Sequence, residues 1–322
     1  MSEVDPIRRV MLTGASGFVG RHMLRELLAG GYTPICLARS DRKLDRVLGQ
    51  LDRRRIEVVS GSLFDRHAVR DAAERSDACI HLVGVIMERR MAGQTFDRVH
   101  RVGTMNVVDA LLAAGRRRYV HMSALGSRPD AVSRYHQTKW AAEEYVRRST
   151  LDWTIFRPSV IHGPDGEFME LMRTFACGLI PPVRPYFGSG ENRLQPVSVR
   201  DVAFCFVESL RRPETIGKAF DLGGPETYSW KELYDTCSRL IPGAKRWKPL
   251  AAQPVPIAKL LAMTVMKTPL VPRKLKFNVD QVQMSQEDSV CDIQPVKDAF
   301  AIGLRRFEDE LRTYADVIGA VS

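Results

Sequence analysis

Ser123, Tyr135 and Lys139 are the residues whose types and spacing best fit acid–base chemistry. Tyr135 and Lys139 stand four positions apart in Tyr135-His-Gln-Thr-Lys139, which places them on one face of a predicted helix. An ammonium near a phenol can lower its pKa, so that Tyr135 could exchange a proton with a carbonyl–alcohol pair during hydride transfer. Ser123 follows a predicted strand and would hydrogen-bond the reacting oxygen. These three are the predicted catalytic residues.

A glycine-rich turn near the start of the chain predicts a dinucleotide site. An apolar strand at 10–13 runs directly into Gly14-Ala-Ser-Gly17-Phe-Val-Gly20, and a helical pattern follows at once. Gly14 suits a tight turn, Gly17 lets backbone amides approach a pyrophosphate, and Gly20 permits close packing of helix on strand. The helix N-terminus offers free amides and partial positive charge to the phosphates. The cofactor contacts expected from this turn are Gly14, Ser16, Gly17, Phe18, Val19 and Gly20.

The end of the second predicted strand bears on the choice of nucleotide. Arg39 follows Gly20 by 19 residues, where an NAD site places an acid against the ribose hydroxyls. A cation there, with Ser40 and Arg42 beside it, fits the additional 2′-phosphate of NADP instead. The alternative is an ordinary solvated arginine at the end of a strand. We therefore expect NADP(H), with NAD(H) as the second choice.

The elements that must position these residues alternate regularly through the first half of the chain. Short apolar runs predict strands at 10–13, 34–38, 56–60, 78–83, 119–122 and 153–156, and helical patterns lie between them at 18–29, 42–50, 66–74, 96–114 and 134–148. Apolar strands alternating with helices indicate right-handed crossovers and a parallel sheet covered on both faces. The predicted fold class is α/β, a doubly wound parallel sheet (Rossmann fold) with a smaller C-terminal lobe.

The alternation breaks down after Arg157-Pro158. Proline, glycine and aromatic residues crowd 163–190, which predicts long loops around a short helix at 169–175. The late elements are predicted as strands at 195–199 and 219–222, which we expect to join the same sheet, and helices at 200–210, 230–240 and 305–317. We assign 1–158 to the dinucleotide-binding core and 159–322 to late sheet strands interleaved with a substrate or lid lobe.

Length and composition exclude several classes of protein. The 322 residues are 44% hydrophobic and 27% charged, which is typical of a globular chain rather than a disordered or fibrous one. The six cysteines form no Cys-x-x-Cys pair, so we expect reduced, buried thiols and no metal site. No run approaches about 18 apolar residues, and the N-terminus has no apolar signal core. We expect a cytoplasmic protein, with peripheral association at the inner face of the membrane left open.

Further motifs carry a resemblance to a known family. They are His81-Leu-Val-Gly84, Val99-His-Arg-Val-Gly-Thr104, His121-Met-Ser-Ala-Leu-Gly126, Asp152-Trp-Thr-Ile-Phe-Arg-Pro-Ser159, His162-Gly-Pro164, Gln195-Pro-Val-Ser-Val-Arg-Asp-Val202 and Leu222-Gly-Gly-Pro225. With them the chain resembles, over nearly its whole length, the extended or atypical short-chain dehydrogenase/reductases, which include epimerase/dehydratase-like proteins. More narrowly, it looks like the group around the Rossmann-fold accessory subunit of respiratory complex I and its bacterial relatives.

That resemblance implies bound NADP(H) and a site near the membrane face. It implies no known reaction, because the mitochondrial subunit is regarded as structural. We also expect cofactor contacts from Ser62, Leu63, Val83, Gly84 and Pro158, beside Tyr135 and Lys139.

Three features depart from the sugar-epimerase pattern. His100 stands where those enzymes usually carry an asparagine, and we interpret it as a packed or hydrogen-bonded helix residue rather than a catalytic base. The gap of 12 residues from Ser123 to Tyr135 is shorter than theirs, and Ser62 replaces an aspartate that commonly contacts adenine. These differences are compatible with cofactor binding and count against epimerase turnover.

A basic stretch without acids lies in the last hundred residues. Residues 245–276 hold eight of the chain's cations and no Asp or Glu, against a net charge of +10 for the whole chain. An apolar run at 257–266 lies within the stretch. Apolar residues among cations suit a segment at an anionic membrane surface or a lid over an apolar substrate. The cations could instead clamp a diphosphate, or form the solvated rim of a helix that caps the sheet.

Three hypotheses of function follow. The first is an NADP(H)-dependent oxidoreductase acting on a small apolar or membrane-derived carbonyl or alcohol, such as a quinone or isoprenoid precursor. The second is a non-catalytic NADPH-binding subunit or redox sensor on a membrane respiratory complex. The third is a nucleotide-sugar epimerase or dehydratase. Nucleic acid is not an expected partner, since the sequence has no helix-turn-helix or stacking-platform signature.

Overall fold

The central sheet is built from six strands in the first half of the chain and one later strand. A computed structural model describes residues 7–40, 42, 44–45, 49, 51–179, 181–268, 271–272 and 275–319. Seven strands, all paired in parallel, form the sheet in the order β11-β6-β5-β4-β1-β2-β3. Their bounds are β1 (Arg9–Thr13), β2 (Thr33–Ala38), β3 (Glu57–Ser60), β4 (Ala78–His81), β5 (Arg118–Met122), β6 (Asp152–Pro158) and β11 (Lys218–Leu222). This is the strand order of a doubly wound Rossmann sheet, and the predicted fold class is confirmed.

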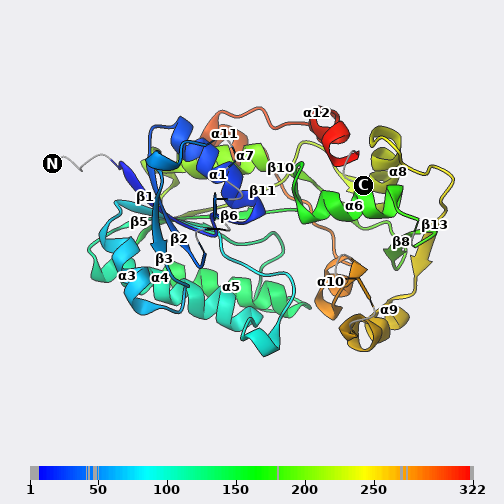
Figure 1. Ribbon diagram of the computed structural model, residues 1–322, viewed down its shortest axis with the longest axis horizontal. Helices are drawn as coiled ribbons and strands as arrows, with labels where there is room; N and C mark the ends of the chain where they lie inside the picture. The colour runs from blue at the N-terminus through cyan, green and yellow to red at the C-terminus, as the bar shows by residue number, and fades with distance from the viewer. Residues whose placement is uncertain are drawn as a thin grey trace.

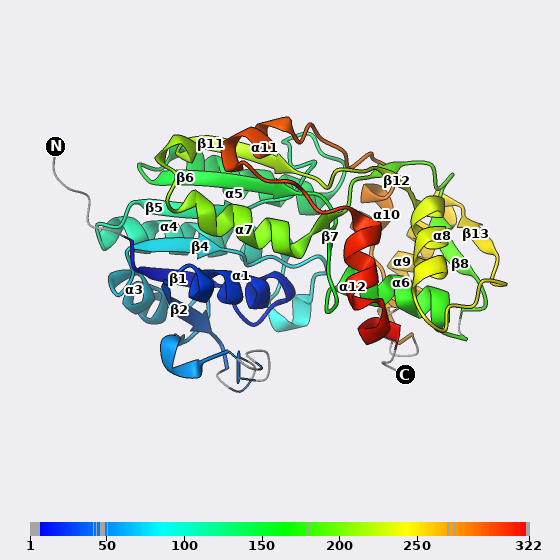
Figure 2. The same ribbon diagram turned by 90° about the horizontal axis from the view of Figure 1, so that it is seen from above.

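Helices cover both faces of the sheet (Figures 1 and 2). One face carries α1 (Phe18–Ala29), α7 (Val199–Ser209) and α11 (Gln294–Phe300), and the other carries α3 (Arg66–Glu74), α4 (Gly103–Ala113) and α5 (Arg134–Arg148). Neighbouring strand residues point to opposite faces, so Leu12 lies in the core under α1 and α7 while Met11 lies in the core under α3 and α4. Because both faces of the sheet are covered by helices, the strand sequences are nearly continuous apolar runs.

Two predicted elements of the core differ in the structure. The helix predicted at 96–114 opens with the π-helical turn η3 (Asp97–Val102) before α4 begins. The prediction that 195–199 joins the main sheet is wrong: β10 (Val197–Ser198) pairs with β7 (Ile161–His162) in a separate two-stranded sheet. The Ser198 side chain accepts a hydrogen bond from the Arg200 amide and caps α7, so the strand ends there. The helix predicted at 42–50 lies partly outside the described residues.

The second lobe is built around its own apolar cluster. It consists of α6 (Glu167–Cys177), β8 (Arg184–Phe187), β9 (Arg193–Leu194), β12 (Tyr228–Ser229), α8 (Trp230–Leu240), β13 (Leu250–Gln253), α9 (Val255–Met263), α10 (Val279–Met284) and α12 (Phe307–Gly319). Short helical turns occur in both parts of the molecule: η1 (Arg53–Arg55), η2 (Arg90–Ala92) and η4 (Pro213–Thr215) between elements of the core, and η5 (Val265–Lys267) after α9. Met172, Leu233 and Leu311 are fully buried where α6, α8 and α12 meet.

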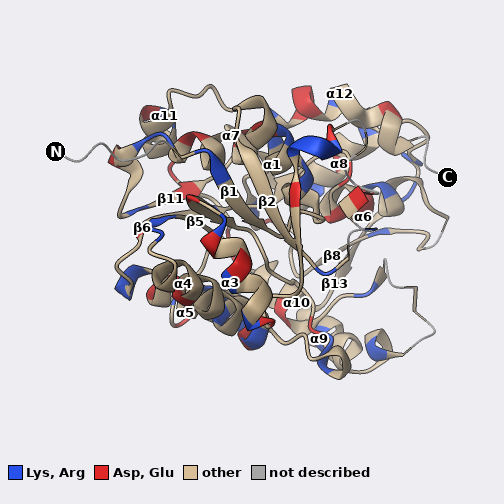
Figure 3. Ribbon diagram, turned by 60° about the vertical axis from the view of Figure 1, so that its left-hand side comes forward, with Lys and Arg blue, Asp and Glu red and all other residues tan. Residues whose placement is uncertain are grey.

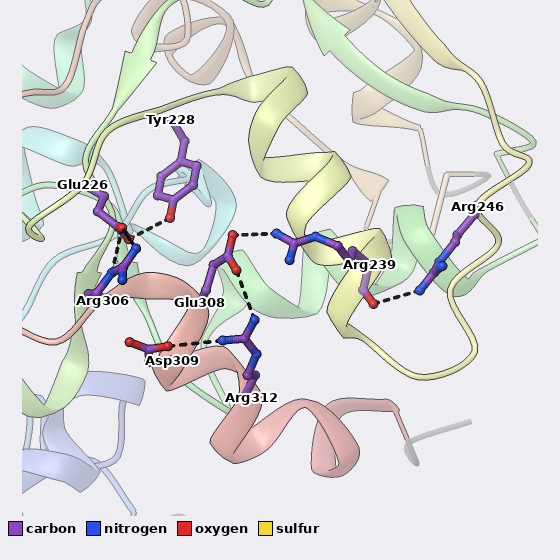
Figure 4. Close-up of polar contacts among 8 residues, drawn as sticks. All are labelled: Glu226, Tyr228, Arg239, Arg246, Arg306, Glu308, Asp309 and Arg312. Atoms are coloured by element: carbon purple, nitrogen blue, oxygen red, sulfur yellow. Dashed lines mark hydrogen bonds and ion pairs between the residues drawn. The ribbon is translucent and has the colours of Figure 1, made fainter.

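Polar contacts join two of these helices at the surface of the lobe (Figure 4). The Glu308 carboxylate of α12 accepts hydrogen bonds from Arg239 of α8 and from Arg312 one turn later. Arg306 donates to Glu226, which also accepts from the Tyr228 hydroxyl. Because these pairs are largely exposed, each contributes little to stability, and the apolar cluster beneath them holds the lobe together.

The basic stretch forms regular elements. Its strand β13 pairs in parallel with β8, and α9 and η5 follow. Some of its cations serve the fold: the buried Lys248 ammonium donates to the Phe175 and Gly178 carbonyls, and Arg246 donates to the Ser238 carbonyl. Arg273 and Lys274 lie outside the described residues.

The cysteines are all free, four of them buried, while Cys177 and Cys291 are partly exposed. Among the described residues, no cluster of three or more His, Cys, Asp or Glu side chains could hold a metal ion. Within the same ranges, none of the helices has the length and apolar character needed to cross a membrane.

Gly20 sets the distance between α1 and β1. A Cβ at this position would lie 2.1 Å from the Gly14 carbonyl oxygen and 2.7 Å from the Ala15 Cα, both of them backbone atoms. We expect Gly20→Ala to lower the free energy of unfolding by about 2 kcal/mol or more, measured by urea denaturation. Gly303→Ala, with open space around its Cβ position, is the control. Equal unfolding midpoints for the two variants would contradict this packing constraint.

Candidate cofactor and substrate site

A large cavity lies at the carboxyl ends of the parallel strands. Its volume is about 1240 Å³. The core side of its wall is formed by residues that follow successive strands: Gly14 after β1, Arg39 after β2, Val83 after β4, Ser123 after β5 and Ser159 after β6. The opposite wall comes from the second lobe. Doubly wound folds bind their ligands at this edge of the sheet.

The glycine turn leaves backbone groups open toward the cavity. Gly14 has φ +79°, a conformation that L side chains rarely adopt, and the Gly17 amide donates to the Gly14 carbonyl at 2.9 Å. Gly17 is the N-cap of α1 and supplies no side-chain cap. The first amides of α1 are therefore free to meet an anion, and this cradle fits a dinucleotide pyrophosphate.

Most predicted cofactor residues line this cavity, and two do not. Those in its wall are Gly14, Ser16, Gly17, Phe18, Val19, Gly20, Arg39, Ser62, Leu63, Val83, Gly84, Tyr135, Lys139 and Pro158. Ser40 and Arg42 are absent from the wall, because the chain turns away from the sheet after Ala38 into helical residues at 42 and 44–45. Arg39 is exposed at the rim, and of this predicted trio it is the residue that faces the cavity.

Ser123, Tyr135 and Lys139 are brought together in the same wall. Tyr135 and Lys139 lie one turn apart on α5, whose N-cap Ser133 accepts a hydrogen bond from the His136 amide. Ser123 is buried just beyond the end of β5, and its Oγ donates to Ser127 Oγ at 3.2 Å. All three line the same cavity as the glycine turn.

The Lys139 side chain is buried although its amine can carry a positive charge. Its Nζ donates to the Met122 carbonyl at 3.0 Å, and a Cβ at position 84 would lie 2.9 Å from Nζ, so Gly84 leaves room for the ammonium. Burial lowers the pKa of Lys139 to about 8, although Glu143 one turn later acts in the opposite direction. Glu143 is fully buried and accepts hydrogen bonds from Arg157 at 2.8 and 2.6 Å.

Tyr135 differs from the expectation of a lowered phenol pKa. Burial raises the pKa of Tyr135 to about 12, and no charge offsets it. The physical reason is the burial of the phenol, which disfavours the charged phenolate. The ring packs edge-on against Phe96 and His100, with centroids 5.9 and 5.3 Å away. At neutral pH the Tyr135 phenol is therefore protonated.

Three buried imidazoles, those of His81, His100 and His121, lie near Lys139. Burial, with Lys139 as the next cause, lowers the pKa of His81 to about 3 and that of His100 well below its usual range. The pKa of His121 is also lowered, chiefly by burial. His100 is packed and hydrogen-bonded, as the sequence predicted, with Nδ1 2.9 Å from Thr138 Oγ1 and Nε2 3.1 Å from the Val85 amide nitrogen. These neutral rings add no positive charge beside Lys139.

The lobe side of the cavity is apolar, and the sequence indicated only part of it. The residues include Phe168, Leu171, Phe175, Val183, Pro185, Tyr186, Phe187, Trp230, Tyr234, Leu261, Met266, Val271, Leu275, Phe277 and Met284. They come from segments far apart in the chain, of which the aromatic-rich loops at 163–190 and the apolar run at 257–266 were signalled by the sequence. Of the cations in the cavity wall, Arg128 is ion-paired with Glu287 and Lys276 donates to the Thr268 carbonyl.

The segment around α10 fastens the lobe to the core beside the predicted catalytic residues. Asp280 accepts a hydrogen bond from the Tyr135 amide at 3.2 Å, and the Asn278 side chain donates to the Ile86 carbonyl at 2.8 Å. Glu287 pairs with Arg128 on the loop after β5. These contacts place the apolar wall opposite Tyr135.

Comparison with known proteins agrees with this geometry. A family described as NAD(P)H-binding matches residues 14–175. Ceramide reductase of Caulobacter vibrioides is 31% identical over 236 residues, which are 73% of this chain and 71% of that protein. The mitochondrial NADH dehydrogenase (ubiquinone) 1 alpha subcomplex subunit 9 of Arabidopsis thaliana is 27% identical over 293 residues, 88% of this chain and 71% of that protein.

Solved structures show the same fold. The UDP-glucose 4-epimerase of Thermotoga maritima, determined with UDP-glucose, superposes with a TM-score of 0.70 at 17% identity, covering 95% of this chain and 97% of that one. At this identity the likeness concerns architecture alone. The family match and the fold agree, and the chain belongs to a family of NAD(P)H-binding proteins with a Rossmann fold.

Proposed function

We propose that this protein is an NADP(H)-dependent reductase of an apolar, lipid-like carbonyl compound. The observation that carries the proposal is the division of one cavity into two halves. Gly14, Gly17 and the N-terminus of α1 offer amides on one side, and aromatic and aliphatic side chains enclose the other. Tyr135 and Lys139 lie in the wall of this same cavity. The similarity to a ceramide reductase supports a lipid carbonyl among the apolar candidates, which also include quinones and isoprenoids.

The protonation states favour the reductive direction. The glycine turn and the N-terminus of α1 would hold the dinucleotide, whose nicotinamide would supply a hydride to the carbonyl carbon. Tyr135, protonated at neutral pH, delivers the proton to the carbonyl oxygen, and Ser123 donates a hydrogen bond to that oxygen. Lys139, charged below about pH 8, stabilises the phenolate that forms. The product is the corresponding alcohol, and the phenolate regains its proton from solvent.

Replacing the phenol tests this mechanism. We expect Tyr135→Phe to lower kcat for reduction of a lipid ketone or quinone by about 10²- to 10⁴-fold while NADPH binding is kept. Turnover is measured by the loss of NADPH absorbance. The control is Tyr145→Phe on the same helix, whose hydroxyl donates to Asp109 instead. Undiminished turnover in Tyr135→Phe would show that another group supplies the proton.

The pH dependence tests Lys139 separately. Because the cationic form is required, kcat/KM for reduction should fall as the pH rises through about 8. The negative charge of Glu143 raises the pKa of Lys139, so Glu143→Gln should move this decline to lower pH. Glu144→Gln, which removes a carboxylate paired with Arg148, is the control and should leave the profile in place. If Glu143→Gln leaves the pH profile unchanged, the fall of kcat/KM at high pH is not caused by deprotonation of Lys139.

The choice of NADP over NAD is assigned to Arg39. A charge-assisted contact with the 2′-phosphate is worth about 1.5–3 kcal/mol, which corresponds to about ten- to a hundredfold in affinity. We expect Arg39→Ala to raise the Kd of NADPH by this factor and to leave the Kd of NADH nearly unchanged, as measured by nucleotide fluorescence. Arg42→Ala, whose side chain is outside the cavity wall, is the control. Equal losses for both nucleotides would reject the assignment.

A second candidate is a non-catalytic NADPH-binding subunit. The similarity to a subunit of mitochondrial NADH dehydrogenase favours it. The rate of NADPH release into excess NADP⁺ distinguishes the two functions. Release within about a second is compatible with ordinary turnover, of order 10 per second or somewhat slower, whereas retention for hours indicates a structural nucleotide. The third candidate, a nucleotide-sugar epimerase, is disfavoured because the lobe wall of the cavity is apolar. Arg128, a cation in the cavity wall, is already paired with Glu287 and is not free for a sugar diphosphate.

A further inference from the structure

Helix α9 exposes apolar side chains on its outer face. Ile257, Leu260 and Met263 are 52%, 58% and 50% exposed, and their spacing of three places them along one side of the helix. Val265, in the turn that follows, is 43% exposed. On the opposite side Ala258 and Ala262 are buried. A continuous row of large apolar side chains in water is unfavourable and typically marks a contact surface.

The surroundings of this face are cationic. Lys259 lies on α9 and the exposed Lys267 lies in η5, and neither forms an ion pair with any residue that the structure describes. Residues 245–276 contain no acid, and Figure 3 shows lysines, in blue, on α9 and the turn after it. Two acids of the neighbouring segment, on and after α10, bind the core: Asp280 accepts from the Tyr135 amide and Glu287 pairs with Arg128. The surface therefore attracts anions.

The inner side of the same segment belongs to the cavity. Leu261 of α9 and Met266 of η5 line it, followed by Val271 and Leu275. Figure 1 places α9 beside α10 at the edge of the second lobe. One short segment thus separates the apolar half of the cavity from an exposed apolar surface with cations around it.

We propose that the α9 face, consisting of Ile257, Leu260, Met263 and Val265 with Lys259 and Lys267, docks on an anionic lipid bilayer. The apolar side chains enter the interface between headgroups and acyl chains, and the ammonium groups meet lipid phosphates. The apolar half of the cavity then lies one helix away from the bilayer, which gives an apolar substrate a short path from the acyl chains. This delivery role rests on the proposed reductase function, whereas the docking does not.

Vesicle binding by the full-length protein tests the docking without any turnover. We expect cosedimentation with vesicles of mixed phosphatidylcholine and phosphatidylglycerol, weak binding to phosphatidylcholine alone, and a loss of binding at high salt. Leu260→Glu should weaken partitioning about tenfold or more, and Lys267→Glu about fivefold or more. The control is Val317→Glu, a similarly exposed apolar residue at 61% on α12, which should bind as the wild type does.

Three outcomes would overturn the proposal. One is equal binding of the wild type to neutral and anionic vesicles, or binding to neither. Another is an equal loss in Leu260→Glu and Val317→Glu. The third is a wild-type dimer that Leu260→Glu converts to a monomer, which would assign the face to a second copy of the chain. NADPH affinity, measured for every variant, reports whether each one is folded. Failure of docking with intact turnover would leave the reductase proposal standing.

Discussion

The burial of the Lys139 ammonium is the constraint on which the site depends. A charged amine removed from water loses solvation energy, and the surrounding structure must replace it. Here the Met122 carbonyl accepts a hydrogen bond from Nζ, and the Glu143 carboxylate lies one turn along the same helix. Glu143 is itself buried and is compensated by Arg157 from β6. The face of α5 that carries Tyr135 and Lys139 is thus fixed against two strands by electrostatics as well as by packing.

The same constraint explains the residues around it. Gly84 must lack a side chain because the ammonium lies where a Cβ would stand. The imidazoles of His81, His100 and His121 can lie behind the site because burial keeps them neutral, so they do not compete with the ammonium for negative charge. His100 also hydrogen-bonds the Val85 amide, which fixes the backbone just beyond Gly84. Motifs that look separate in the sequence therefore share one electrostatic environment.

The sequence was sufficient to predict the parallel sheet apart from the strand at 195–199, the alternation of helices and strands along the chain, and most of the core wall of the cavity. Those features depend on local patterns: strand periodicity, the glycine turn, and the spacing of Tyr135 and Lys139. It was insufficient where distant segments meet. The apolar wall gathers Phe168, Trp230 and Phe277, and no local pattern relates these residues. The pKa of Tyr135 was mispredicted for a related reason, since helical spacing reveals a neighbouring lysine but not how deeply both groups are buried.

Helix α9 extends this argument from the site to its surroundings. A helix on the surface of a globular protein usually has one apolar side and one polar side. In α9 the small residues Ala258 and Ala262 pack inward, Leu261 faces the cavity, and Ile257 and Leu260 face outward. An acid on any of these sides would oppose either an apolar substrate or an anionic surface, and the sequence from 245 to 276 contains none. The composition of 245–276 and the position of α9 are thus explained together if α9 contacts an apolar substrate on its cavity side and a lipid bilayer on its outer side.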